Sequence, residues 1–298
     1  MKKENVTFLG ADGNKLAADV FPVDCKKFVA LLMHGGGQTR HSWRKTAISL
    51  AERGITAICI DARGHGNSDW LEDKSYTFDN YAADVASIAV QIRQNYGIKP
   101  ICIGASLGGI SAMLAQSRSE RDLLEALVLV DITPRMDVNG VAKIQGFMSD
   151  KMHDGFATIE QAADAIAAYL PERKRPRSLD GLQKNLRKGD DGRWRWHWDP
   201  AFIDGPMSIN TVSTDFQQKL LDSAADLNIP TLLVRGARSE LVSEEYAKEF
   251  LSLVPHAHYA DVSDAGHMVA GDKNDIFSDA VISFLEDVVL SDQKSKAV

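Results

Sequence analysis

The chain of 298 residues contains few cysteines and no long apolar run. Its three cysteines, Cys25, Cys59 and Cys102, include no Cys-x-x-Cys pair and are odd in number, so a disulfide framework is not expected. Cys59 and Cys102 lie within apolar segments, which predicts small buried thiols in strands. No apolar run approaches the roughly 18 residues that a membrane-spanning helix needs, so a membrane is not an expected partner.

The sequence also lacks a strong excess of charge and a targeting segment. Its 41 acidic and 34 basic residues give a net charge of −7, and a mildly acidic protein repels polyphosphate, so nucleic acid is not an expected partner. The opening segment, MKKENVTFLGADG, has two lysines but no apolar stretch behind them, so neither a signal peptide nor an anchor is expected. We therefore expect a cytoplasmic protein. Hydrophobic residues at 44% and charged residues at 25% are typical of a globular fold and exclude disorder.

Short apolar segments alternate with amphipathic ones over the first 130 residues. Residues 6–8 and 16–21 flank the turn sequence ADGN and predict a hairpin. Helices are predicted at 43–53, at 81–95 and from Leu107 onward. Buried strands are predicted at 28–33, 56–60, 101–104 and 127–130. Continuous apolar strands separated by helices predict an α/β fold with a mostly parallel central sheet flanked by helices.

The pattern changes between residues 132 and 225, where helical stretches occur without a buried strand. The alternation then resumes with strands at 231–235 and 258–262 and helices at 244–253 and 276–289. The sequence therefore predicts a core made of residues 1–131 and 226–298. Residues 132–225 are predicted to form an inserted helical cap, or lid, over the C-terminal edge of the strands, where ligands bind in open α/β sheets.

A candidate nucleophile lies in segment 104–108, GASLG, between a buried strand and a helix. A nucleophile on such a strained turn needs neighbours without bulky side chains two residues away on either side, and glycine meets that need. The following helix start offers free N–H groups and the positive end of its dipole, both of which favour an oxyanion. Ser106 is therefore the predicted nucleophile.

A glycine loop, His34 followed by three glycines, closes the strand at 28–33. Glycine lets the backbone approach a substrate and direct an N–H toward it. An oxyanion hole needs two such groups, which we assign to Gly36 and Leu107, with Gly35 as a substrate contact. His34 is expected to shape the loop rather than to transfer protons.

Candidates for the base and its acid follow later strands. His267, in segment 264–268 (DAGHM), lies just after a strand and is predicted to take the proton of Ser106. The acid that orients the base should follow a late strand, which favours Glu240. Asp131, at the end of the strand 127–130, is the alternative.

The glycine loop, the serine turn, the acid and the histidine, in this order along the chain, resemble the α/β-hydrolase superfamily, in particular its esterase and non-haem peroxidase-like branch. Segment 61–68, DARGHGNS, is similar to the loop that this family carries after its fourth strand, and we interpret it as a structural turn. The resemblance covers about 1–131 and 226–298, and it implies the α/β-hydrolase fold and a Ser–His–acid triad. The family more often has aspartate where Glu240 stands.

An alternating series of tryptophans is the main sequence feature that bears on the substrate pocket. Trp194, Trp196 and Trp198 alternate, so they face one side of an extended segment. They either seat the cap on the core or line a pocket for the acyl or alcohol group. The candidate pocket residues are Gly35, Trp43, Met148, Trp196 and Met268.

The combined pattern predicts a serine hydrolase that cleaves small-to-medium carboxylic esters through an acyl-enzyme. A lactone hydrolase, a carbon–carbon bond hydrolase or a perhydrolase would use the same triad, and a non-catalytic small-molecule receptor on the same fold is the alternative of another class. The sequence contains no metal-ligand cluster and no glycine-rich phosphate motif with lysine, so neither a metal nor another cofactor is implied. The expected partner is an ester-like small molecule, and the expected state is a monomer or homodimer.

Overall fold

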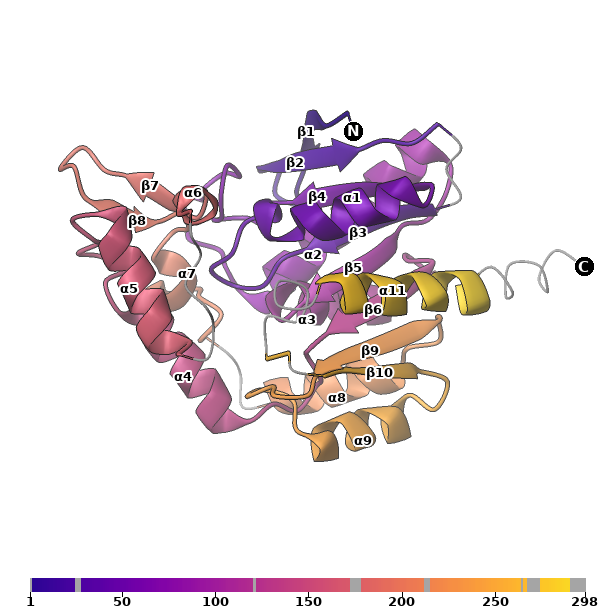
Figure 1. Ribbon diagram of the computed structural model, residues 1–298. Helices are drawn as coiled ribbons and strands as arrows, with labels where there is room; N and C mark the ends of the chain where they lie inside the picture. The colour runs from indigo at the N-terminus through magenta and orange to yellow at the C-terminus, as the bar shows by residue number, and fades with distance from the viewer. Residues whose placement is uncertain are drawn as a thin grey trace, which may run out of the picture.

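A computed structural model of the protein describes residues 2–24, 28–119, 122–171, 178–211, 215–263, 265–266 and 274–289. Its centre is an eight-stranded sheet with the order β1-β2-β4-β3-β5-β6-β9-β10 (Figure 1). The first two strands pair antiparallel, β2 is antiparallel to β4, and the remaining pairs are parallel. The strands are β1 (Glu4–Leu9), β2 (Lys15–Phe21), β3 (Phe28–Met33), β4 (Ile55–Ile60), β5 (Ile101–Ala105), β6 (Ala126–Val130), β9 (Thr231–Gly236) and β10 (His258–Val262).

Helices cover both faces of this sheet. On one face α1 (Arg44–Glu52), preceded by the short 3₁₀ helix η1 (Arg40–Trp43), lies beside α11 (Asn274–Phe284), which continues into the π-helical turn η2 (Leu285–Val289). The other face carries α2 (Phe78–Tyr96), α3 (Leu107–Ser117), α8 (Phe216–Ala225) and α9 (Glu244–Leu253). Alternate side chains of β3 enter the two cores, Leu31 on one side and Leu32 on the other. The predicted fold class is confirmed.

Buried thiols occur where the apolar segments predict them. Cys59 in β4 and Cys102 in β5 are free and buried. Burial raises the pKa of the Cys102 thiol to about 12, which keeps it protonated and inert at neutral pH. Among the described residues, no helix combines the length and apolar character that crossing a membrane requires.

The insertion after β6 lies beyond the C-terminal ends of the strands (Figure 1). It contains α4 (Val138–Ser149), α5 (Ile159–Tyr169), α6 (Asp180–Gln183) and α7 (Ala201–Asp204). It is not wholly helical, because β7 (Leu186–Lys188) and β8 (Trp194–Trp196) form an antiparallel ribbon. The last helix before β9, α8, lies inside the predicted cap range and packs against α3 and α9.

The cap is anchored on the loop that follows β4. The N–H of Gly66 donates to the carbonyl of His197 at 2.7 Å, and the N–H of Asp199 donates to the carbonyl of Gly64 at 2.8 Å. The hydroxyl of Tyr76 donates to Asp199 Oδ2 at 2.8 Å. Residues 197–199 of the cap are therefore fixed on the core by backbone and side-chain hydrogen bonds.

The same loop is held from within by buried charges. Asp61 accepts from the backbone N–H of Arg40 at 2.6 Å and of Asn67 at 2.9 Å. The Arg63 guanidinium donates to both oxygens of Asp84, at 2.7 and 2.6 Å. These contacts support the interpretation of segment 61–68 as a structural turn.

Candidate active site

Ser106 occupies a strained turn between β5 and α3, with a φ of 46°. A side chain at Gly104 would place its Cβ 2.5 Å from the backbone nitrogen of Gly109, and one at Gly108 would lie 2.5 Å from the carbonyl oxygen of Met33. Both positions therefore require glycine, and the turn projects the serine at the C-terminal edge of the sheet. Backbone strain of this kind is concentrated at functional sites.

The glycine loop after β3 lies against this serine. A Cβ at Gly35 would be 3.5 Å from the Cβ of Ser106. The N–H groups of Gly35 and Gly37 are bonded, to Gln38 Oε1 at 3.3 Å and to His65 Nε2 at 3.2 Å. Within the part of the chain that the structure describes, the N–H of Gly36 has no protein acceptor. It is therefore available to a ligand.

Leu107 offers a second available N–H. It is the first residue of α3, where a backbone N–H has no acceptor within the helix. No other acceptor for it is found among the described residues. Gly36 and Leu107, the two residues predicted for the oxyanion hole, thus each have an available backbone N–H.

His34 is buried and holds the glycine loop in place. Its Nδ1–H donates to the carbonyl of Gly35 at 2.8 Å, and its Nε2 accepts from the N–H of Ala62 at 3.0 Å. Burial lowers the pKa of the imidazole, so it stays neutral and can keep accepting this N–H. These contacts account for the expected role in shaping the loop.

The two candidate acids have different surroundings. Val130, the last residue of β6, is paired with Ala105, the last residue of β5. Asp131 and Ser106 therefore each directly follow one of two neighbouring strands. The Asp131 carboxylate is fully buried, accepting from the N–H of Gly236 at 2.9 Å and from the hydroxyl of Ser239 at 2.6 Å.

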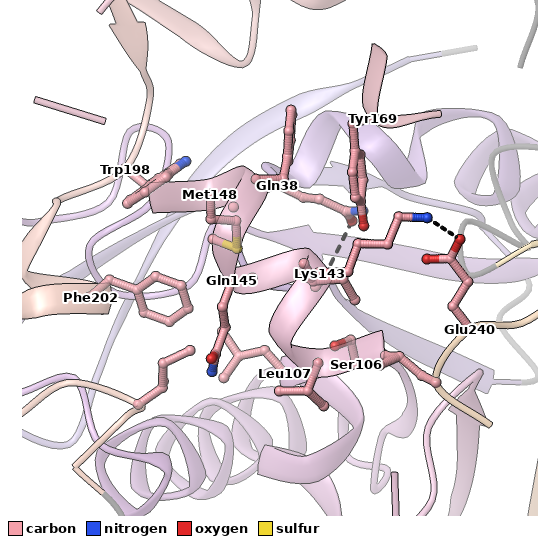
Figure 2. Close-up of a pocket in the computed structure, with 18 of the residues that line it drawn as sticks. Gln38, Ser106, Leu107, Lys143, Gln145, Met148, Tyr169, Trp198, Phe202 and Glu240 are labelled. Atoms are coloured by element: carbon pink, nitrogen blue, oxygen red, sulfur yellow. Dashed lines mark hydrogen bonds and ion pairs between the residues drawn. The ribbon is translucent and has the colours of Figure 1, made fainter. Parts of the chain in front are cut away.

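Glu240, in contrast, is partly open to solvent. Its side chain is 42% exposed and its carboxylate pairs with Lys143 Nζ at 2.5 Å. Figure 2 shows the two side chains directed toward each other. His267 and Met268 lie outside the described residues.

A cavity of about 1220 Å³ opens above Ser106, between core and cap. Trp198, Met148 and Phe202 lie on one side of it and Tyr169, Lys143 and Glu240 on the other (Figure 2). Of the predicted site residues, those that line the cavity are Gly35, Gly36, Ser106, Leu107, Met148, Trp196 and Glu240. The structure thus brings together seven residues from five separate parts of the sequence.

Comparison with known proteins agrees with this geometry. Residues 30–273 match the family described as alpha/beta hydrolase fold. The chain belongs to this family. It is 29% identical over 249 residues to esterase Rv0045c of Mycobacterium tuberculosis, covering 82% of this chain and 78% of that protein. It is 26% identical over 279 residues to the sn-1-specific diacylglycerol lipase ABHD11 of Danio rerio, covering 91% and 82% of the two chains.

Among solved structures, the crystal structure of E-2-(acetamidomethylene)succinate hydrolase superposes with a TM-score of 0.80 and 22% identity, covering 96% of this chain and 100% of that one. At this identity the likeness shows a shared fold. The structure of the M. tuberculosis esterase gives a TM-score of 0.73 at 26% identity, covering 96% of this chain and 92% of that one.

One prediction about the pocket of this α/β-hydrolase is wrong. Trp43 does not line the cavity; it is 2% exposed and packs against Phe277 with ring centroids 5.9 Å apart. It ends η1 on the face covered by α1 and α11, so its ring enters the core there instead of reaching the C-terminal edge under the cap.

The alternating tryptophans divide between the two interpretations. Trp196 and Trp198 are buried and form part of the pocket wall. The backbone of Trp198 also pairs with His65 of the core, whereas the ring of Trp196 packs on Phe156 within the cap. Trp194 does not line it and pairs through its backbone with Phe156. Phe202, Lys143 and Tyr169 also line the cavity but were not predicted from the sequence. The residues around them do not show which cap side chains face the cavity and which face solvent.

Proposed function

We propose that this α/β-hydrolase is a serine esterase that cleaves small-to-medium carboxylic esters through an acyl-enzyme. The observation that carries the proposal is Ser106 on a strained turn, beside two available backbone N–H groups, in a large cavity. Two N–H groups stabilise the oxyanion of acyl transfer, so the reacting atom is a carbonyl carbon.

In the proposed reaction, Ser106 Oγ attacks the carbonyl carbon while His267 takes the hydroxyl proton. The N–H groups of Gly36 and Leu107 hold the resulting oxyanion. The intermediate collapses as His267 returns the proton to the leaving alcohol, which leaves an ester on Ser106. Water then attacks this ester as His267 takes its proton, and His267 returns that proton to Ser106 Oγ as the acid product is released.

For the acid, the described contacts support Asp131 over Glu240. Asp131 adjoins the nucleophile strand, and two donors fix its buried carboxylate. An acid that orients a histidine must itself be held, and a charge in a buried setting interacts more strongly than one in water. Glu240 is already neutralised by Lys143 and is partly screened by solvent.

The cavity supports the choice of substrate. Its volume of about 1220 Å³ lies above the range of about 300–1,000 Å³ that is common for small-molecule sites. The cavity therefore accommodates more than a short acetate ester. Met148, Trp198 and Phe202 give one wall an apolar surface suited to a hydrocarbon group. Two of the relatives reported above are named as an esterase and a lipase, and a third, from Cupriavidus necator, as a 3-hydroxybutyrate-oligomer hydrolase.

Ser106→Ala tests the function directly. We expect turnover of a 4-nitrophenyl ester to fall by about 10⁴–10⁶, because covalent catalysis needs the hydroxyl. A fluorophosphonate probe should label the wild type and leave the variant unlabelled, with an unchanged circular dichroism spectrum. A panel of esters, lactones and diketones identifies the substrate class. Full activity of the variant would refute the assignment of Ser106, and turnover of only lactones or diketones would refute the ester.

A further inference from the structure

His65 lies behind the glycine loop with both ring nitrogens engaged. Its Nδ1–H donates to the carbonyl of Arg63 at 2.9 Å, and its Nε2 accepts from the N–H of Gly37 at 3.2 Å. The ring is fully buried and does not line the cavity, so it cannot reach a substrate. The Gly37 N–H is a donor, so Nε2 must be unprotonated for the bond to exist.

The same ring supports a wall of the cavity. Phe202 packs edge-on against His65 with ring centroids 4.7 Å apart. Phe202 in turn approaches the glycine loop, because a Cβ at Gly36 would lie 3.0 Å from its Cζ. Residue 65 also pairs through its backbone with Trp198, which lines the cavity beside Phe202 and Met148 (Figure 2). His65 thus contacts the loop, the cap and the structural turn 61–68 at once.

The loop around Gly36 is held on both sides. Gly35 is bonded to Gln38, and its carbonyl accepts from His34. Gly37 has a φ of 75°, and its N–H is bonded to His65. A flexible glycine segment would otherwise sample many conformations, so fixing both neighbours sets the direction of the Gly36 N–H between them.

We propose that His65 is a positioning residue for the oxyanion hole: by accepting the Gly37 N–H and supporting Phe202, it sets the Gly36 N–H against the oxyanion formed at Ser106. The proposal rests on the proposed esterase function. It assigns to His65 an effect on the charged transition state and none on binding of the neutral ester.

The first test removes the acceptor and keeps an aromatic ring. In His65→Phe the kcat for a 4-nitrophenyl ester should fall about 10- to 100-fold with KM within about threefold, since loss of a whole oxyanion donor costs about 10²–10³. His65→Gln supplies an amide oxygen as acceptor and should restore kcat to within about tenfold of the wild type. The control is His153→Phe, an exposed cap histidine that should leave both constants unchanged.

A second measurement separates positioning from general structural support. Phenylboronic acid forms an anionic tetrahedral adduct with a serine nucleophile and so resembles the intermediate. Its inhibition constant should rise across wild type, His65→Gln and His65→Phe in proportion to the loss of kcat/KM. An unchanged kcat in His65→Phe, or a lower kcat with an unchanged boronate inhibition constant, would overturn the proposal.

The unmodified protein provides a test that does not depend on folding of the variants. Burial, with His34 and His197 nearby, lowers the pKa of His65 to about 3, and Tyr81 and Phe202 complete its surroundings. In histidine ¹⁵N spectra the ring of His65, identified by its absence from His65→Gln, should therefore be neutral and protonated at Nδ1 from pH 5 to 8, and His34 should give a second signal of this tautomer. Protonation of the His65 ring within this pH range, or an Nε2–H tautomer, would refute the proposed positioning role of His65. Activity retained in Ser106→Ala would instead refute the esterase.

Discussion

The two candidate acids, Asp131 and Glu240, differ in what surrounds each carboxylate. Asp131 is buried under the donors of Gly236 and Ser239, whereas Glu240 extends toward Lys143 at the solvent. A buried carboxylate that loses its charge alters the field at a neighbouring imidazolium more than an exposed one does, because water screens the exposed charge.

Asp131→Asn and Glu240→Gln form a matched pair that tests this difference. We expect Asp131→Asn to lower kcat by about 10²–10⁴, because the base loses the charge that stabilises its protonated form. Glu240→Gln should change kcat by less than about threefold, since it breaks only a partly exposed ion pair. Steady-state kinetics on one ester, with melting temperatures of both variants, measures this. The opposite order would assign the acid to Glu240.

Single residues could be predicted where a local steric need selects them. Gly104 follows from the turn itself, because a Cβ there meets the backbone of Gly108 and Gly109 within the same few residues. Trp43 could not be placed, because its neighbours do not reveal which face of the sheet η1 covers. Gly37 and Phe202, two of the partners of His65, lie 28 and 137 positions away in the sequence, and no local pattern encodes such contacts.

At the scale of elements, the turn from β5 into α3 depends on how closely α3 approaches β3. Gly108 lies in α3, and a Cβ there would be 2.6 Å from the Met33 Cβ as well as against its carbonyl. The helix can therefore start directly behind Ser106 only if position 108 has no side chain. Gly146 in α4 is also helical, but a Cβ there meets nothing within 4 Å.

Gly108→Ala and Gly146→Ala should therefore change stability in opposite directions. Gly108→Ala forces α3 away from β3, and we expect a loss of about 1–3 kcal/mol together with a large fall in kcat. Gly146→Ala should raise stability by up to about 1 kcal/mol, because alanine is the better helix former. Urea unfolding of both variants measures this. A neutral Gly108→Ala would mean that the approach of the two elements is not tight.

The core elements could be predicted closely, and the cap only in part. β3, β10 and α9 have the predicted bounds, because apolar runs and a well-capped amphipathic helix carry strong local signals. The β7–β8 ribbon could not be foreseen, because its strands have three residues each and one buried side chain each. Short exposed strands leave no periodicity to read.

For the whole molecule, the histidines buried at the junction of core and cap link folding to pH. His34 and His65 have pKa values lowered by burial, that of His65 from 6.5 to about 3. The unfolded chain therefore binds more protons than the folded one between about pH 3 and pH 6.5. Their neutral contacts are fully stabilising above pH 6.5, and the stability falls as the pH decreases through that window.

We therefore expect His65 to lower the free energy of unfolding by about 1–2 kcal/mol between pH 7 and pH 5, and His34 to add a loss of the same sign. Asp19 and Asp79, whose pKa values are lowered by arginine and lysine partners, add their own loss only at more acidic pH. Urea midpoints at pH 5, 6 and 7 measure the slope. In His65→Gln the slope should be smaller, because glutamine does not titrate. A wild-type slope in His65→Gln would show that His65 does not resist protonation in the folded protein.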